Sequence, residues 1–274
     1  MFAKLLKHEW RATRGVLGLL CLISLSAALL GGGAMRYLVS FSNQENQAGL
    51  GVVLCVLSMI AAIVGIFICA TGIEFFTIWR FYKSRFTDEG YLTFTLPVTT
   101  HQVLLSSLVI NLIGAAVAIA ALAVSFTVFG IVGFSALEGL FPMLWDMMPS
   151  IWEKLKLLLE QEELRYVWMF LANALIGMLC EIVVVMLSVT IGSIIAQKHK
   201  ILAAIGVYYG IHVGISLVSG TIGILGNLPA MTSSANPYGV FSNLLVSQMV
   251  LFLVIGVVSY ILMYHFVNRK LNLN

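Results

Sequence analysis

The sequence predicts an all-α polytopic membrane protein with six transmembrane helices, and three observations support this class. Charged residues make up only 10% of the 274 residues and hydrophobic residues 60%, whereas about a quarter of a soluble domain is charged. Apolar runs of about 20 residues recur, and each is long enough to cross a hydrocarbon core of about 30 Å. These runs do not alternate with period two, so we expect helices rather than a β-barrel, because lipid leaves no partner for open backbone groups.

We expect the six spans to form a single transmembrane domain over residues 1–274. They cover residues 15–35, 50–76, 103–132, 166–195, 201–221 and 245–266. Of the 15 Lys and Arg residues, eleven fall on the side of the two termini, and the other four are Arg36, Lys154, Lys156 and Arg165. By the positive-inside rule, this asymmetry predicts a multi-pass protein of the cell membrane with both termini cytoplasmic.

Residues 1–14 look like a separate N-terminal element. Apolar side chains such as Leu5 and Trp10 share one helical face, and the opposite face carries Lys4, Lys7, His8 and Arg11. This pattern favours an interfacial helix on anionic headgroups; the alternative is a plain basic anchor that forms no helix. A signal peptide also begins this way, but the apolar run 15–35 exceeds the usual 7–15 residues, so we expect a retained first span.

A polar insert, Arg80–Gln102, separates the second and third spans and reads RFYKSRFTDEGYLTFTLPVTTHQ. Thr99 and Gln102 fit a capping box, which predicts that the third helix begins near Thr100. The rest has room for one short helix and a turn at Asp88–Glu89–Gly90, with its aromatic residues bedded at the membrane interface. Because the insert carries both charge signs, we favour a docking element for a partner protein; the alternative is a membrane-surface loop without a partner.

Two outer segments have recognisable patterns. Residues 149–165 form an amphipathic sequence, which predicts a helix along the outer membrane surface or capping the bundle, with structural packing favoured over a gating role. Residues 223–243 are rich in turn formers, including Gly226 and Pro229, and part of this segment is expected to dip into the membrane as a broken hairpin.

Glu181, His212 and Glu74 are ionisable residues that fall inside predicted spans. Glu181 lies near the middle of span four and His212 near the middle of span five, and a short cytoplasmic turn makes these spans antiparallel neighbours, so the two side chains can pair. A lone carboxylate at this depth costs a few kcal/mol. The pair either lines a translocation path or has a structural role. Glu74, near the cytoplasmic end of span two, is expected to be structural, or else to relay motion from the insert.

Small residues repeat every fourth position in spans four and five. Gly206, Gly210 and Gly214 are one such set, and Ser188, Gly192 and Ala196 are another. Small residues at this spacing let membrane helices approach closely. We expect a tight pairing of spans four and five, and the alternative is a contact between subunits.

The sequence offers little that points to catalysis within the chain. It contains no G-x-x-x-x-G-K-[ST] phosphate loop and no nucleophile elbow. Its five His residues have no metal-ligand spacing, and its four Cys residues all lie in apolar runs, which favours buried free thiols. We therefore expect no enzyme activity, metal or cofactor in this chain, and nothing in its charge pattern suggests nucleic acid.

The insert, most closely between Phe81 and Leu105, and the six-span topology around it resemble the permease subunits of type-2 ABC exporters, the compact kind of Gram-positive bacteria. The resemblance implies that the insert is a coupling helix seated in a separate ATPase. It further implies an assembly of two permeases, identical or related, with two ATPase subunits that hold ATP and Mg²⁺. The ATPase-facing candidates are then Arg80, Lys83, Arg85, Asp88 and Glu89. The segment 223–243 is similar to the re-entrant outer hairpin that family members often have.

On this resemblance, the expected function is that of a permease that exports an amphipathic cargo, such as a peptide, a lipid or an antimicrobial. The alternative is a non-transporting membrane protein, either a sensor, an immunity protein or a scaffold, which would bind no ATPase. An integral membrane enzyme would be expected to gather ionisable residues at the cytoplasmic ends of its spans, and the sequence shows no such cluster.

Overall fold

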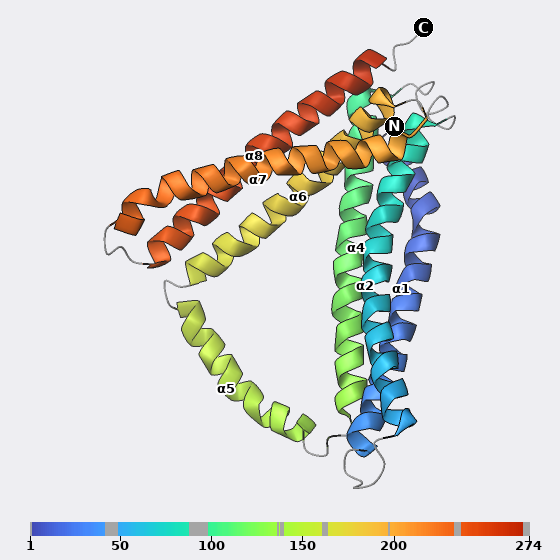
Figure 1. Ribbon diagram of the computed structural model, residues 1–274, viewed down its shortest axis with the longest axis vertical. Coiled ribbons are helices and arrows are strands. Elements are labelled where there is room, and N and C mark those ends of the chain that lie inside the picture. The colour runs from blue at the N-terminus through green and yellow to red at the C-terminus, as the bar shows by residue number, and fades with distance from the viewer. Residues whose placement is uncertain are drawn as a thin grey trace. The chain divides into compact units, whose positions relative to one another are not determined.

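The computed structural model is all-α. It describes residues 2–41, 49–87, 98–135, 137, 140–160, 164–196, 198–232 and 237–270, and every regular element in these ranges is a helix. In chain order the helices are α1 (Phe2–Phe41), α2 (Leu50–Phe86), α4 (Thr100–Phe134), α5 (Leu140–Glu160), α6 (Leu164–Ile195), α7 (Lys200–Thr232) and α8 (Pro237–Lys270), as labelled in Figure 1.

The all-α membrane class is confirmed. Six of the described helices, all except α5, are long and apolar enough to cross a membrane. Each predicted span lies within one of these six helices, and each helix extends beyond the predicted span. The extensions arise because hydropathy marks only the part that suits lipid, whereas backbone hydrogen bonding continues beyond it at one or both ends.

Three predicted boundaries differ from the structure. α1 continues unbroken through Gly15, so residues 1–14 are not a separate element. α5 occupies Leu140–Glu160 instead of 149–165, with Pro149 inside the helix. α7 continues as a helix to Thr232, so the expected turn at Gly226 and Pro229 is absent from this described stretch. In each case a helix that begins earlier in the chain continues through the residue that was expected to interrupt it.

The described chain groups into two compact units, and this grouping cuts through α2 and α4 instead of dividing the sequence into successive domains. The first, here called the α1 unit, comprises Ala3–Trp79 and Val109–Lys156. The second, the α6 unit, comprises Arg80–Leu108 and Leu157–Asn274 together with Met1–Phe2.

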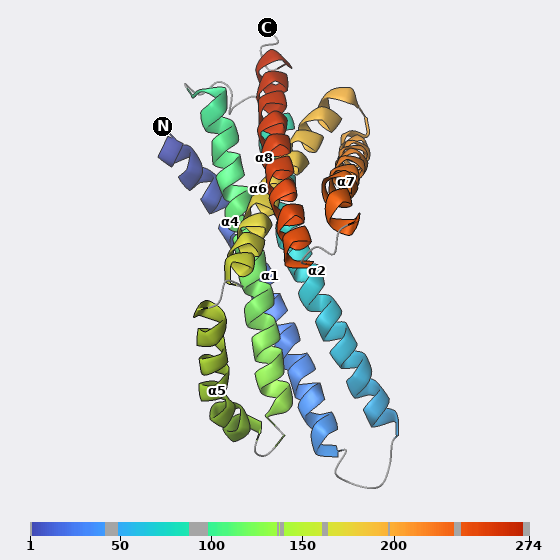
Figure 2. The same ribbon diagram turned by 90° about the vertical axis from the view of Figure 1, so that its left-hand side faces the viewer.

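Small residues bring the helices of the α1 unit together, and Figures 1 and 2 show α1, α2 and α4 side by side. A Cβ added at Gly31 would collide with Ala62 of α2 and with Phe129 of α4. Deeper in the unit, the hydroxyl of Ser125 donates to Ser24 Oγ over 3.2 Å, and both side chains are buried. Close approach and interhelical hydroxyl bonds are the main attractive contacts available to helices in lipid.

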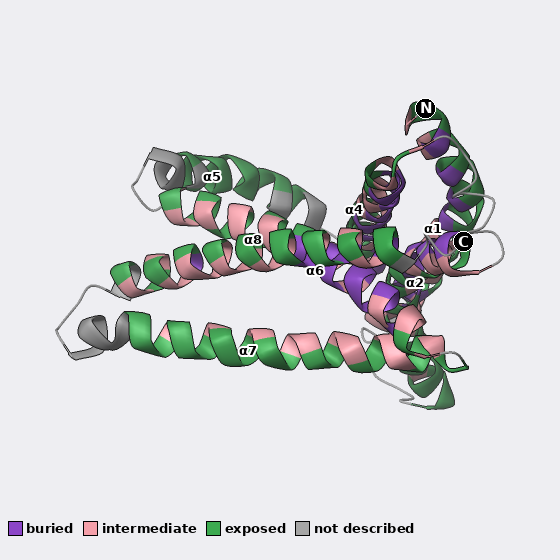
Figure 3. Cartoon of the chain, turned by 90° about the horizontal axis from the view of Figure 1, so that it is seen from above, coloured by how far each residue is buried: buried purple, intermediate pink, exposed green. Residues whose placement is uncertain are grey.

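In the α6 unit, α6 packs against both α7 and α8, and it is the most buried of the three helices. Gly192 near the end of α6 touches the backbone of Ala204 on α7, and Gly256 of α8 lies over Cys180 of α6. α7 is far more exposed, as the green and pink ribbon in Figure 3 shows. This arrangement places the middle of α6 against polar side chains of α7.

Candidate functional site

Two places in the α6 unit combine polar chemistry with defined geometry. One is the stem of the insert, meaning the described residues Arg80–Thr87 and Val98–Leu108. The other is a cluster of Glu181, Tyr208 and His212 between α6 and α7, which we call the carboxylate cluster. Both lie within one compact unit.

Arg85 ties the two halves of the stem together. Its side chain comes from the last turn of α2 and is only 3% exposed. The guanidinium Nη2 donates to Ser107 Oγ at 3.1 Å and to the Val103 carbonyl at 3.5 Å, both on the first turns of α4. Phe81, also buried, packs edge-on against Phe86 with ring centroids 5.7 Å apart. These contacts hold the beginning and the end of the insert together, and we call them the clasp.

This burial corrects one predicted site residue. We expected Arg85 to face an ATPase, but a side chain held inside the stem is not available to another protein. Lys83 is exposed and Arg80 is partly exposed, and their role as ATPase-facing residues stays a prediction. Asp88 and Glu89 lie outside the described residues.

The second half of the stem begins with a cap. The Gln102 backbone amide donates to Thr99 Oγ1 over 3.4 Å, and the Val103 amide donates to the Thr99 carbonyl over 3.2 Å. α4 begins at Thr100, which confirms the predicted start of the third helix. The threonine half of the predicted capping box is thus formed, and it fixes where the chain enters α4.

His101, in the first turn of α4, connects the stem to α8. Its ring stacks on Tyr264 with centroids 4.0 Å apart and planes 14° apart. Its Nδ1 lies 3.1 Å from the Tyr260 hydroxyl, within hydrogen-bond distance. Nothing in the spacing of these residues along the sequence predicted this contact, because 159 positions separate His101 from Tyr260.

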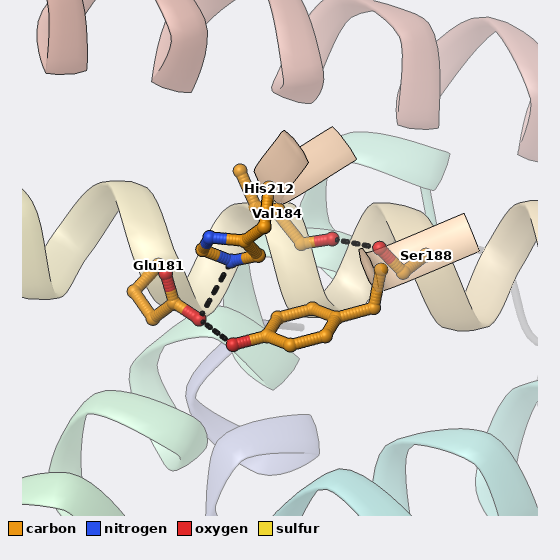
Figure 4. A network of polar contacts seen from close by, with 5 residues as sticks. Glu181, Val184, Ser188 and His212 are labelled. Carbon is orange, nitrogen blue, oxygen red and sulfur yellow. Dashed lines mark hydrogen bonds and ion pairs between the residues drawn. The ribbon is translucent and has the colours of Figure 1, made fainter. Parts of the chain in front are cut away.

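The carboxylate cluster confirms the predicted pairing of Glu181 with His212. The Tyr208 hydroxyl donates to Glu181 Oε1 over 2.6 Å, and His212 Nε2 lies 3.3 Å from the same oxygen. The imidazole contact has an ion-pair distance but not the geometry of a hydrogen bond. Figure 4 shows Glu181 and His212 turned toward each other, with Ser188 donating to the Val184 carbonyl nearby. Glu181 is 44% exposed and His212 is 32% exposed.

Helix periodicity explains why these side chains meet. Ala204, Tyr208 and His212 are four residues apart, so they fall on one side of α7. Ala204 touches Gly192 of α6, which turns this side of α7 toward α6. Glu181 is about 21 Å along the helix axis from Ile195, and His212 is about 18 Å from Lys200, so the two antiparallel helices bring them to similar depth.

The same geometry corrects the predicted packing role of Gly206, Gly210 and Gly214. A Cβ added at any of the three meets no atom within 4 Å. These glycines are offset by two residues from the α6-facing side, which is about 200° around the helix. The close approach of α6 and α7 is instead made by Gly192, from the other predicted set. The alternative that Gly206, Gly210 and Gly214 face a second subunit stays a prediction.

Two further polar residues of the predicted spans have surroundings of their own. Asn173 of α6 donates to Gln248 Oε1 of α8 over 3.3 Å and does not contact Glu181. Glu74 is exposed on α2, in the α1 unit, and its structural or relay role remains a prediction. In the part of the chain that the structure describes, no three His, Cys, Asp or Glu residues come together as a metal site.

Sequence reasoning missed Tyr208, although the pattern that could have identified it was present. Tyr208 precedes His212 by four residues, and their ring centroids are 4.3 Å apart. A tyrosine one turn away from an intramembrane histidine shares its face and has a hydroxyl that needs a partner in lipid. Gln248 could not have been found in this way, because α6 and α8 are far apart in sequence.

Comparisons with known proteins identify no relative of this chain. The chain matches no protein-family model, no curated protein and no solved structure.

Proposed function

We propose that the chain is the permease subunit of an ATP-driven exporter, coupled through the insert Arg80–Gln102 to separate ATPase subunits. The observation that carries this proposal is the clasped stem. A surface loop without a partner has no need of a buried arginine between its two ends, whereas a segment that transmits force has to be held firmly at its base.

The lengths of the flanking helices support this proposal. α2 has 37 residues and α4 has 35, which correspond to about 55 and 52 Å of helix. A bilayer with its headgroups is about 40–45 Å thick. Roughly 10 Å of each helix is therefore left over. Because the last turn of α2 carries the exposed Lys83, the excess fits best on the side of the insert, which would raise the insert above the headgroups.

The contacts of the stem supply a route for motion. Arg85 joins the stem's two halves, and His101 stacks on Tyr264 of α8. α8 in turn packs on α6 through Gly256 and Cys180. We propose that closure of the ATPase subunits on ATP moves the insert, and that the stem passes this movement through α8 to α6. For cargo to influence which side of the membrane the transport path opens to, it must bind the two states of the permease with different affinity.

The assembly expected on this proposal contains two permease chains and two ATPase subunits, which hold ATP and Mg²⁺. This chain supplies the transmembrane path and its docking insert. The cargo is an amphipathic molecule, since the helices offer an apolar path with few charged groups. The membrane is the cell membrane, with both termini on the cytoplasmic side.

Co-purification tests the proposal. The chain is co-expressed with the ABC ATPase encoded nearest to its gene and is purified through a tag on the permease. We expect the wild-type chain to retain the ATPase, and the double variant Asp88→Ala/Glu89→Ala to lose most of it. Lys83→Glu, which reverses an exposed charge of the stem, should weaken retention as well.

Lys198→Glu is the matched control, because it reverses an exposed basic residue in the turn between α6 and α7, which is predicted to lie on the same side of the membrane. This variant should retain the ATPase as the wild-type chain does. Size-exclusion profiles must show that every variant is folded. A folded wild-type chain that never retains an ATPase would contradict the proposal and favour the non-transporting alternative.

A further inference from the structure

We propose that the carboxylate cluster is a binding site for the ammonium group of a cationic amphiphile, with Glu181 as the residue that contacts it. This inference rests on the proposed function, because it names the chemical class of the cargo. The observation behind it is that only one of the two carboxylate oxygens of Glu181 has a partner among the described residues.

The two oxygens have different surroundings. Oε1 accepts the Tyr208 hydroxyl at 2.6 Å and faces His212 Nε2 at 3.3 Å. Among the described residues, Oε2 has neither a hydrogen bond nor an ion pair, and the side chain is 44% exposed. A carboxylate oxygen open at mid-depth of a membrane costs a few kcal/mol unless water or a cation meets it. The internal contacts therefore orient the carboxylate and leave one oxygen for a ligand.

His212 does not complete the pairing of Glu181. Its Nε2 is near Oε1 but outside hydrogen-bond geometry, and its ring is tilted by 55° over Tyr208. A fully paired buried carboxylate would be expected to show directed hydrogen bonds to both oxygens. The imidazole acts here as a wall of the site beside the tyrosine ring.

The donor set favours an organic cation over a metal ion. Metal ions in proteins take several ligands from carboxylates, imidazoles or thiolates, and no such group of three is present in the described ranges. An ammonium group is satisfied by one carboxylate oxygen and by aromatic faces. Tyr208, whose hydroxyl meets Oε1, brings aromatic rings close to the carboxylate: its ring lies 4.3 Å from that of His212 and 5.7 Å from that of Tyr209.

The surroundings suit a ligand whose cationic group is attached to an apolar body. Ile205 and Tyr209, within one turn of Tyr208 on α7, are 48% and 65% exposed. An alkylamine can place its charge on Oε2 and its chain along these side chains. A small hydrated cation would gain nothing from them.

A pair of fluorescent probes tests the charge requirement without an ATPase. Dansylcadaverine has a free ammonium group, and its N-acetyl derivative has nearly the same shape without the charge. Binding of each is titrated against the purified chain in nanodiscs of phosphatidylcholine, with empty nanodiscs as the blank. We expect the ammonium probe to bind the wild-type chain about tenfold or more tightly than the acetylated probe.

Three variants locate the site. Glu181→Gln should abolish the difference between the two probes, whereas Glu181→Asp should keep part of it because the charge remains. Tyr208→Phe should weaken ammonium binding severalfold by releasing the carboxylate. Glu74→Gln, a second carboxylate of a predicted span, is the matched control and should leave both titrations unchanged.

Equal binding of the two probes to the wild-type chain would overturn the proposal. So would an unchanged difference in a folded Glu181→Gln variant. If that variant does not fold, the wild-type comparison and Tyr208→Phe decide. Ammonium binding without ATPase retention would place the cation site in a non-transporting protein, and retention without ammonium binding would leave a permease for another cargo.

Discussion

Arg85 and Glu181 both place a charged group away from bulk water, and the α6 unit treats them in opposite ways. Arg85 is 3% exposed and bonds to two groups of α4. The Glu181 side chain is 44% exposed and meets its partners through one oxygen only. The first arrangement joins two helices and is closed to ligands, and the second leaves a carboxylate oxygen that a ligand can reach.

The difference separates a structural charge from a functional one. A buried charge that is bonded to a second helix costs desolvation but fixes one geometry. A half-exposed charge with one open oxygen fixes less and is free to meet a ligand. Arg85 should therefore matter mainly for stability, and Glu181 mainly for binding.

The strongest way to break this comparison is Arg85→Ala. The change removes two hydrogen bonds from a charged donor and leaves Ser107 and the end of α2 less well held. We expect unfolding free energy to fall by about 2–4 kcal/mol. Thermal unfolding in detergent, followed by intrinsic tryptophan fluorescence, measures the loss.

Lys83→Ala is the control, because Lys83 lies two residues earlier in α2 and is exposed. Its effect should stay within about 0.5 kcal/mol. Equal losses for the two variants would show that the Arg85 clasp adds nothing beyond ordinary charge removal, and the stem would lose its role as a firm base.

The next prediction sharpens the Glu181 side, which depends on α7 turning Ala204, Tyr208 and His212 toward α6. Gly192→Ala adds a Cβ that would collide with the backbone of Ala204, which cannot rotate away as a side chain can. We expect a loss of about 1–3 kcal/mol from overpacking. Gly206→Ala adds a Cβ that meets nothing, so its effect should be neutral or stabilising by up to about 1 kcal/mol.

The reverse order of stability would mean that α7 presents its glycine side to α6. Oligomeric mass tests the remaining alternative for Gly206, Gly210 and Gly214. If they face a second subunit, Gly210→Leu should shift the light-scattering mass toward the monomer and leave the stability of the single chain unchanged.

The sequence predicted the helical class, the six spans and the pairing of Glu181 with His212. Each of these depends on local apolarity or on two antiparallel neighbours joined by a short turn. It also predicted the start of α4, because a capping threonine acts over three residues. These features need no knowledge of distant contacts.

Features that depend on helix rotation could not be predicted. Two four-residue repeats run along α7, Ala204–Tyr208–His212 and Gly206–Gly210–Gly214, and periodicity alone gives no reason to choose between them. Arg85 was similarly assigned to the surface because it lies in the predicted docking insert, whereas its burial depends on Ser107 and Val103 lying opposite. The helices themselves were predicted correctly, but the side of the helix that packs against its neighbour was not.

The smallest effect is expected for Tyr208→Phe, which removes only the hydroxyl that holds Glu181 Oε1. Interhelical hydrogen bonds in membranes average about 0.6 kcal/mol, so thermal unfolding should change by that amount, while ammonium binding weakens severalfold. Tyr209→Phe is the control, since Tyr209 is 65% exposed, and it should change stability even less. A loss above about 2 kcal/mol for Tyr208→Phe would exceed the largest such bond measured and would show that Glu181 is held as a structural charge, as Arg85 is. A small loss of stability together with weaker binding is the combination that only a positioned, partly open carboxylate produces.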